Sequence, residues 1–430
     1  MFIFSFTNKP QCLRISLAIQ LALPLTMLFG LALLAPGATA QTATQAPSLK
    51  QALDAAWQLN GSSRAESNRR SELAAKEKAA NSWMSGEPTL GVAHRTDRLN
   101  RNEGFREYEA EIELPLWNPG VRAAARADVS AQRQGFDSQL ALAKLKLAGE
   151  LRALSASAAS AQVELDLNKR KLLDANVLAE DLSRRIKAGE NARVDGLQAQ
   201  VLVQQGQAAI AQAESQLIRL QNQWRSLTGL AAVAALNETP SKLAANETPG
   251  APVSPDHPAL RYAQAQLGAA QAKLALAEAD KRDPMSMGVG VGRERSSFAA
   301  ANETKLRIAL RIPLGGENRN APRQAAARAE LDAAQAEADG VQRQVVAEVS
   351  AATADISAAR AAQTAARERV HFSTEVQTLI TKSWRLGDSD LPARLRADND
   401  QFEASLSLAK ASVDVQRAIA QLNQAHGYLP

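Results

Sequence analysis

The sequence predicts a mainly α-helical protein with a small β part, built from long α-helical hairpins and four short strands. Three observations predict this fold class. The chain is internally duplicated, its composition favours long helices, and two pairs of short segments alternate between polar and apolar residues. Only 4% of the residues are aromatic, and Ala, Gln, Glu, Arg and Leu dominate long stretches, as is typical of closely packed long helices.

The duplication has a constant offset of 198 residues. It relates three pairs of landmarks: Pro115 and Pro313, Gly189 and Gly387, Gly229 and Gly427. A segment rich in proline separates the copies and is incompatible with continuous helix. The sequence therefore predicts a first structural repeat at 48–230, a linker at 231–255 and a second repeat at 256–430.

Residues 1–40 are predicted to be a signal peptide. Lys9 and Arg14 precede the apolar run Ile15–Leu34, and Ala38-Thr39-Ala40 is a small-residue cleavage site. The run is also about long enough to remain as an inner-membrane anchor, which is the alternative. Cleavage would remove Cys12, the only cysteine, and with it every disulfide or thiolate metal ligand.

The strand prediction rests on period-two alternation. One set of side chains is acidic in the first repeat and mostly basic in the second: Glu107, Glu109, Glu111, Glu113, Lys305, Arg307 and Arg311. Apolar residues alternate with them, and segments 88–95 and 284–293 are the expected partner strands. An ordinary soluble sheet with one wet face would show the same pattern. If the strands lie in a membrane, the charged residues must line a water-filled lumen.

Four strands are too few to close a transmembrane barrel, because the smallest known barrels have about eight. Open sheet edges are not tolerated in lipid. Several chains would therefore have to share one barrel, and three chains would supply twelve strands.

Each repeat also carries a long segment without a helix-breaking proline, Pro119–Lys187 and Pro322–Leu386. At 1.5 Å per residue such helices would be about 100 Å long. The predicted returning helices, Val194–Leu227 and Leu391–Ala425, are half that length. The predicted first helices, Leu49–Trp83 and Pro258–Lys281, would complete the layer by stacking end to end with them.

This order of elements, repeated twice, resembles the TolC-like outer-membrane efflux protein family. The resemblance covers nearly the whole chain after the predicted signal peptide. Its specific marks are Leu-Pro-Leu-Trp at 114–117, Ile-Pro-Leu-Gly-Gly at 312–316 and the turn residues Gly189, Asp195, Leu197 and Ala199. The second repeat keeps Gly387, Leu395 and Ala397 but has Ala393 at the position of the aspartate.

The resemblance implies a homotrimer with a shared 12-stranded β-barrel in outer-membrane lipid and a periplasmic helical tunnel. It also implies two partners, a periplasmic adaptor protein and an inner-membrane pump of the RND type. Chain length and the Gly-Tyr-Leu-Pro ending are similar to those of ducts from heavy-metal (CzcC-like) systems, so heavy-metal cations are the expected substrate. Organic drugs are the alternative substrate, and a periplasmic coiled-coil or adaptor protein is the alternative class.

The helix tips are the expected gate and docking region. Glycines at the turns can end a helix and reverse the chain. The candidate residues are Gly189, Asp195, Leu197, Gly387, Asp388, Asp390, Arg385 and Arg394. Repeated by threefold symmetry, the aspartates would form an acidic ring that concentrates cations and pairs with arginines of a neighbouring chain. Helix N-capping by Asp195 or Asp388 is the alternative.

Composition and motifs exclude other functions. The formal net charge of +5 includes two basic residues of the signal peptide, so a nucleic-acid partner is not expected. The four histidines outside the signal peptide are scattered without metal-ligand spacing, and the glycine-rich 288–292 does not open a helix after a strand. We therefore expect no catalytic residues, no cofactor and no bound metal.

Overall fold

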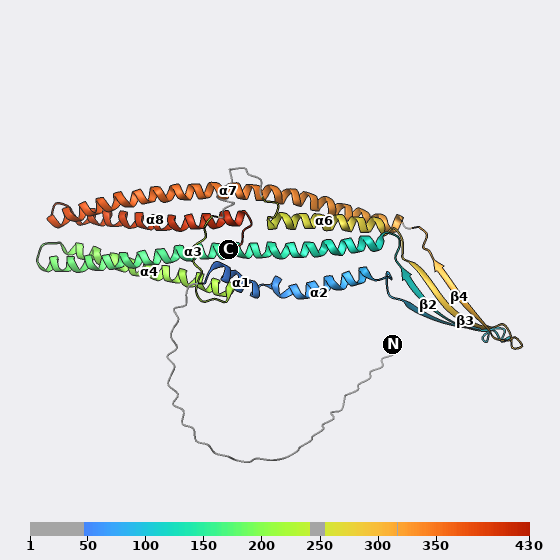
Figure 1. The fold of residues 1–430 in the computed structure, drawn as a ribbon. Coiled ribbons are helices and arrows are strands. Elements are labelled where there is room, and N and C mark those ends of the chain that lie inside the picture. The colour runs from blue at the N-terminus through green and yellow to red at the C-terminus, as the bar shows by residue number, and fades with distance from the viewer. Residues whose placement is uncertain (1–46, 241–253, 316) are drawn as a thin grey trace, which may run out of the picture. The chain divides into compact units, whose positions relative to one another are not determined.

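The computed structural model describes residues 47–240, 254–315 and 317–430. The predicted signal peptide, residues 1–40, lies outside this part of the chain. The described elements run in the order shown in Figure 1. The first repeat contains α1 (Leu49–Leu59), α2 (Gly61–Asn81), β1 (Thr89–Thr96), β2 (Arg106–Leu116), α3 (Val121–Lys187) and α4 (Arg193–Thr228). The second contains α6 (Pro258–Ala279), β3 (Met285–Arg295), β4 (Glu303–Arg311), α7 (Glu317–Leu386) and α8 (Leu391–Ala425).

The two long helices have 67 and 70 residues, as the sequence predicts, and each is covered by shorter helices along its length. Helix α7 packs against α6 and α8, while α3 packs against α2, α1 and α4 (Figure 1). The expected end-to-end stacking of short helices along a long one is therefore confirmed. Helix α3 also contacts α6 and α8, and these contacts join the two repeats.

The first helix is interrupted, and the prediction of one continuous helix from Leu49 to Trp83 was wrong. Asn60 has extended backbone angles, ends α1, and accepts a hydrogen bond from the backbone N–H of Ser62 at 2.8 Å to cap α2. Asparagine is among the best N-cap residues, and Gly61 follows it directly. These two residues divide the segment into two helices.

Helix α7 begins five residues before Pro322, where the sequence placed its start. Pro322 is the sixth residue of the helix and lies beyond its first turn, so the missing N–H removes one backbone hydrogen bond. The helix nevertheless continues through this proline to Leu386.

The core of the described chain is concentrated at the middle of α3. Leu147 and Leu151 pack there with Trp224 of α4, with α1 and with Leu236 of the linker. Arg152 lies beside this cluster and is only 4% exposed. Its Nε lies 2.9 Å from Glu238 Oε1, and its Nη1 donates to the backbone oxygen of Tyr428 at 3.0 Å. A buried ion pair thus fastens the linker and the C-terminus to α3.

The four strands form one antiparallel sheet in the order β1-β2-β3-β4. Strands β2 and β3 come from different repeats and pair along their whole length, from Arg106 opposite Arg295 to Leu116 opposite Met285. The helices continue from one end of the sheet, and the connecting turns lie at the other (Figure 1).

Candidate functional site: the charged sheet face and the helix tips

One face of the sheet carries most of its charged residues, and we call it the charged face. The register places on this one face the residues that the sequence singled out: Glu107, Glu109, Glu111 and Glu113 of β2, and Lys305, Arg307 and Arg311 of β4. The middle strand of this face presents Gly288, Gly290 and Gly292. Acidic and basic strands are therefore separated by a strand that has no side chains at these positions.

The glycines allow ion pairs to cross β3. Arg307 pairs with Glu109, and Arg311 Nη1 lies 2.6 Å from Glu113 Oε1. A Cβ atom on Gly290 would meet the backbone oxygen of Ala110 at 3.1 Å, and one on Gly288 would overlap the carboxylate of Glu111. The opposite charges therefore pair within one sheet, over the glycines of β3.

The other face, which we call the apolar face, is exposed. Val92 is 77% exposed and Ile308 is 71% exposed. In a soluble antiparallel sheet the apolar face packs on the core and the polar face meets water. Here the glutamates of β2 are the more sheltered side chains and the apolar residues between them are exposed. This arrangement is the reverse of that in an ordinary soluble sheet with one wet face, and it suits a sheet in contact with lipid.

The tip turns of the two repeats have the same backbone structure. Gly189 and Gly387 have φ angles of +79° and +86°. In each turn the residue after the glycine donates a backbone hydrogen bond to the fifth residue before it: Glu190 to Arg185 at 2.9 Å, and Asp388 to Ser383 at 3.0 Å. Both glycines therefore end their helices in a Schellman motif, whose left-handed position favours glycine.

The three tip aspartates have different partners. Asp390 caps α8, because its Oδ1 accepts a hydrogen bond from the backbone N–H of Ala393 at 2.9 Å. Asp195 lies in the first turn of α4 and accepts from Asn191 Nδ2 at 3.1 Å. The alternative that Asp195 or Asp388 is the N-cap was wrong, since Asp390 and Ala192 occupy those positions. Asp388 is exposed in its turn.

A clasp of three residues joins the tips of the two hairpins. Trp384 of α7 is 6% exposed and packs with Leu178, Leu182, Ala199 and Leu391. The guanidinium of Arg185 lies 4.4 Å from the centroid of its ring, and that of Arg394 lies 4.1 Å away. We call these three residues the tip clasp. Sequence reasoning missed it, because the helices that supply Arg185 and Trp384 are distant in the chain.

Arg394 is therefore engaged inside its own chain. Its Nε lies 3.6 Å from Asp398 Oδ2, and burial lowers the pKa of its guanidinium against the opposing effect of Asp398. Arg385 and Leu197 are exposed instead, and Leu197 is on the outer side of α4. Of the arginines proposed for contacts between chains, Arg193 and Arg385 are exposed, whereas Arg394 packs in the tip clasp.

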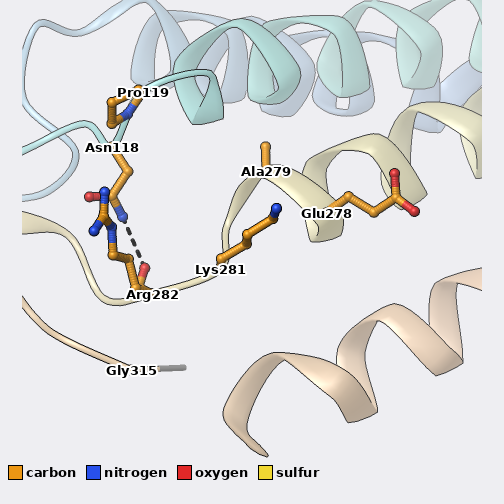
Figure 2. A pocket seen from close by; sticks show the side chains of 7 residues that line it. All are labelled: Asn118, Pro119, Glu278, Ala279, Lys281, Arg282 and Gly315. Atoms are coloured by element: carbon orange, nitrogen blue, oxygen red, sulfur yellow. Dashed lines mark hydrogen bonds between the residues drawn. The ribbon is translucent and has the colours of Figure 1, made fainter. Parts of the chain in front are cut away.

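A pocket of about 510 Å³ lies where the strands become helices (Figure 2). Asn118 is buried there, and its Nδ2 donates to the backbone oxygens of Arg282 and Asp283, each at 3.0 Å. Lys281, Arg282 and Glu278 line the same pocket. Asn118 thus ties the strand-to-helix junction of the first repeat to the helix-to-strand junction of the second.

None of the described helices is both long and apolar enough to cross a membrane. In the same residues, no three His, Cys, Asp or Glu side chains come together as metal ligands.

The fold of the described residues is similar to that of several solved membrane proteins. It matches a membrane protein from Pseudomonas aeruginosa with a TM-score of 0.72 at 20% identity, over 88% of this chain and 90% of that one. It matches the outer membrane protein VceC from Vibrio cholerae with a TM-score of 0.72 at 14% identity, over 88% and 96%. CusC gives 0.71 at 16% identity, over 89% and 92%.

Residues 255–428, which are the second repeat, match the family described as Outer membrane efflux protein. No curated protein matches the chain. The second repeat is therefore similar to this family, and the fold of the described residues is similar to that of solved outer-membrane proteins.

Proposed function

We propose that three copies of this chain form one continuous duct. Their sheets would make a shared 12-stranded barrel in the outer membrane, and their helices would make a periplasmic tunnel through which substrate passes without chemical change. The observation that carries the proposal is that both the sheet and the helix layer of one chain end in unpartnered edges.

The sheet edges are β1 and β4. Each pairs with a neighbour on one side and leaves backbone N–H and C=O groups unpaired on the other. Such edges cannot remain open in lipid, because unpaired backbone groups there are costly. In a meander of four strands, β1 and β4 run in opposite directions. Strand β4 of one chain can therefore pair antiparallel with β1 of the next and close the ring.

The helix layer has matching edges. Near the tips, α4 contacts α3, α3 contacts α8, and α8 contacts α7, so α4 and α7 are the two ends of the row (Figure 1). Each end helix carries an exposed apolar stripe at helical spacing: Val194, Leu197 and Val201 on α4, and Phe372, Val376 and Leu379 on α7. Packing one stripe against the other across a chain boundary buries both.

We propose divalent heavy-metal cations as the substrate, a periplasmic adaptor as the partner at the tips and an inner-membrane RND pump behind it. Exposed Asp388 and half-buried Asp195 support a cation-attracting entrance when they are repeated three times around an axis. The charged face supplies the carboxylates of β2 farther along the path. Organic toxicants are the competing substrate class.

The test of the substrate is a gene deletion complemented with the wild-type chain or with a chain carrying Asp195→Asn, Asp388→Asn and Asp390→Asn. The proposal expects the deletion to sensitise cells to divalent cobalt, zinc, cadmium or nickel, and the variant to restore resistance only partly. Sensitisation to organic dyes and detergents alone would favour the competing substrate class.

A further inference from the structure

The apolar face of the sheet ends in a row of arginines on the side of the connecting turns. Two rows across the four strands are apolar: Leu90, Ile112, Val289 and Ile308, then Val92, Ala110, Val291 and Leu306. The next row toward the turns contains His94, Tyr108, Arg293 and Thr304, and the row beyond it contains Thr96, Arg106 and Arg295. Three arginines therefore lie where the apolar band stops, and we call Arg106, Arg293 and Arg295 the arginine row.

The positive charges of the arginine row are not balanced by ion pairs with acidic side chains in the described part of the chain. Arg106 lies directly opposite Arg295, an arrangement of like charges that destabilises a sheet. The acidic neighbours in sequence, Glu107 and Glu294, belong to the charged face, where Glu107 pairs with Arg95 and Glu294 pairs with Lys305. Within the described chain, no ion pair includes a member of the arginine row; Arg295 donates through Nε to the backbone oxygen of Gly104 at 3.3 Å.

The side chains around the arginine row suit a membrane interface. Tyr108 stacks on His94 with ring centroids 4.4 Å apart, and both belong to the apolar face. Phe298 in the neighbouring turn is 62% exposed, and the guanidinium of Arg295 lies 5.6 Å from its ring centroid. Tyrosine and other amphipathic aromatic residues are enriched where acyl chains meet headgroups.

We propose that the arginine row binds the phosphate groups of phosphorylated lipids in the outer leaflet. The proposal rests on the proposed function, in which the strands span the outer membrane. Since the helices lie in the periplasm, the turn end of the sheet faces outward and the arginine row lies at the outer headgroup level. Guanidinium groups bind phosphate oxygens bidentately. A lipid, unlike free phosphate, can also cover the apolar rows next to the arginines.

The test compares two glycolipid probes with the purified wild-type channel in neutral detergent: bis-phosphorylated lipid A and the same lipid with its phosphates removed. Bound lipid is counted by native mass spectrometry. We expect the phosphorylated lipid to bind about tenfold more tightly, since several charge-assisted hydrogen bonds are lost without phosphate. The double variant Arg106→Gln with Arg295→Gln should bind both probes alike. Arg282→Gln, at the opposite end of the sheet, is the matched control and should keep the preference.

Three outcomes would overturn the lipid site: equal binding of both probes by the wild type, a preference retained in the double variant, or displacement of lipid A by an equal concentration of inorganic phosphate. The last outcome would indicate a simple anion site. Planar-bilayer conductance of the same samples separates this inference from the proposed function. A conducting wild type without a phosphate preference refutes the lipid site alone, whereas a wild type that forms no channel refutes both.

Discussion

Arg311 Nη1 lies 2.6 Å from Glu113 Oε1, and the two residues are 198 residues apart, which is the offset between the repeats. Arg307 and Glu109 are related in the same way. Equivalent positions of the two repeats therefore carry opposite charges and pair with each other over the glycines of β3. The duplication brings the two equivalent positions close together in the sheet. Their opposite charges then allow the two side chains to form an ion pair.

Removing the basic half of these pairs should change ion selectivity. In Arg307→Gln with Arg311→Gln, Glu109 and Glu113 lose their counter-charges and the charged face becomes more negative. The proposed lumen should then favour cations, and the cation-to-anion permeability ratio should rise by about a factor of two or more. Reversal potentials in planar bilayers under a salt gradient measure this ratio. An unchanged ratio would place the charged face away from the lumen.

Strand β3 should tolerate a larger side chain at one of its glycine positions and not at another. A Cβ on Gly290 would meet backbone at 3.1 Å, whereas a Cβ on Gly292 would meet its nearest atom at 3.9 Å. Gly290→Val should therefore destabilise the sheet by about 1–3 kcal/mol through overpacking, and Gly292→Val should be mild. The yield of heat-modifiable oligomer from outer membranes checks this difference. Equal yields from the two variants would mean that close packing over β3 is unimportant.

Much of the sheet could be predicted from the sequence, because period-two alternation determines which residues share a face. Glu107 to Glu113 and Lys305 to Arg311 were assigned to one face, and the register agrees. The crossing ion pairs could not be predicted while the strand order was unknown. The sequence did contain a sign of these crossing pairs. Gly288, Gly290 and Gly292 are spaced two residues apart, which leaves one face of their strand without side chains.

Arg152 should be one of the most sensitive single positions in the helical part. Replacing it with alanine leaves Glu238, which is 12% exposed at its side chain, without its charged partner. Loss of one member of a buried ion pair costs about 3–5 kcal/mol. Thermal unfolding followed by circular dichroism should show a much lower midpoint for Arg152→Ala. Lys273→Ala, which breaks the exposed pair with Glu330, is the control and should unfold near the wild-type temperature.

Trp384→Ala should loosen the tips. The substitution removes the ring between Arg185 and Arg394 and leaves a cavity among Leu178, Leu182 and Leu391, at a cost of about 3–5 kcal/mol. We expect trypsin to cleave the tip turns faster in this variant, because local opening precedes cleavage. Trp83→Ala removes a tryptophan that is 60% exposed and serves as the control. Equal cleavage rates in the two variants would contradict a role for the clasp.

His257 should make stability fall in acid. It is 4% exposed, and its Nδ1 accepts a hydrogen bond from the backbone N–H of Ala259 at 3.2 Å, which caps α6. Burial lowers its pKa below the ordinary value of 6.5, so the unfolded chain binds the proton more readily. Stability is then lost as the pH falls below the unfolded value.

The test of this effect compares the wild type with His257→Asn, which keeps a capping side chain but does not titrate. Between about pH 7.5 and about pH 5.5, the unfolding temperature of the wild type should fall more than that of the variant. Parallel pH profiles would show that His257 does not contribute.

The tips show what sequence patterns cannot supply. The turns were predicted at Gly189 and Gly387, since a positive φ favours glycine and local sequence determines a helix end. The roles of the surrounding charges depended on tertiary contacts. Arg394 was expected to face another chain, yet it lies on Trp384 of its own chain, and the cap of α8 is Asp390 and not Asp388.

The central claim is that three chains share one barrel. Native mass spectrometry of the detergent-solubilised protein, combined with single cysteines placed at the two sheet edges to cross-link neighbouring chains, tests it most directly. We predict an assembly of three chains, with disulfides between β1 of one chain and β4 of the next that yield a covalent trimer. A monodisperse monomer or dimer, with no cross-link between β1 and β4, would contradict it.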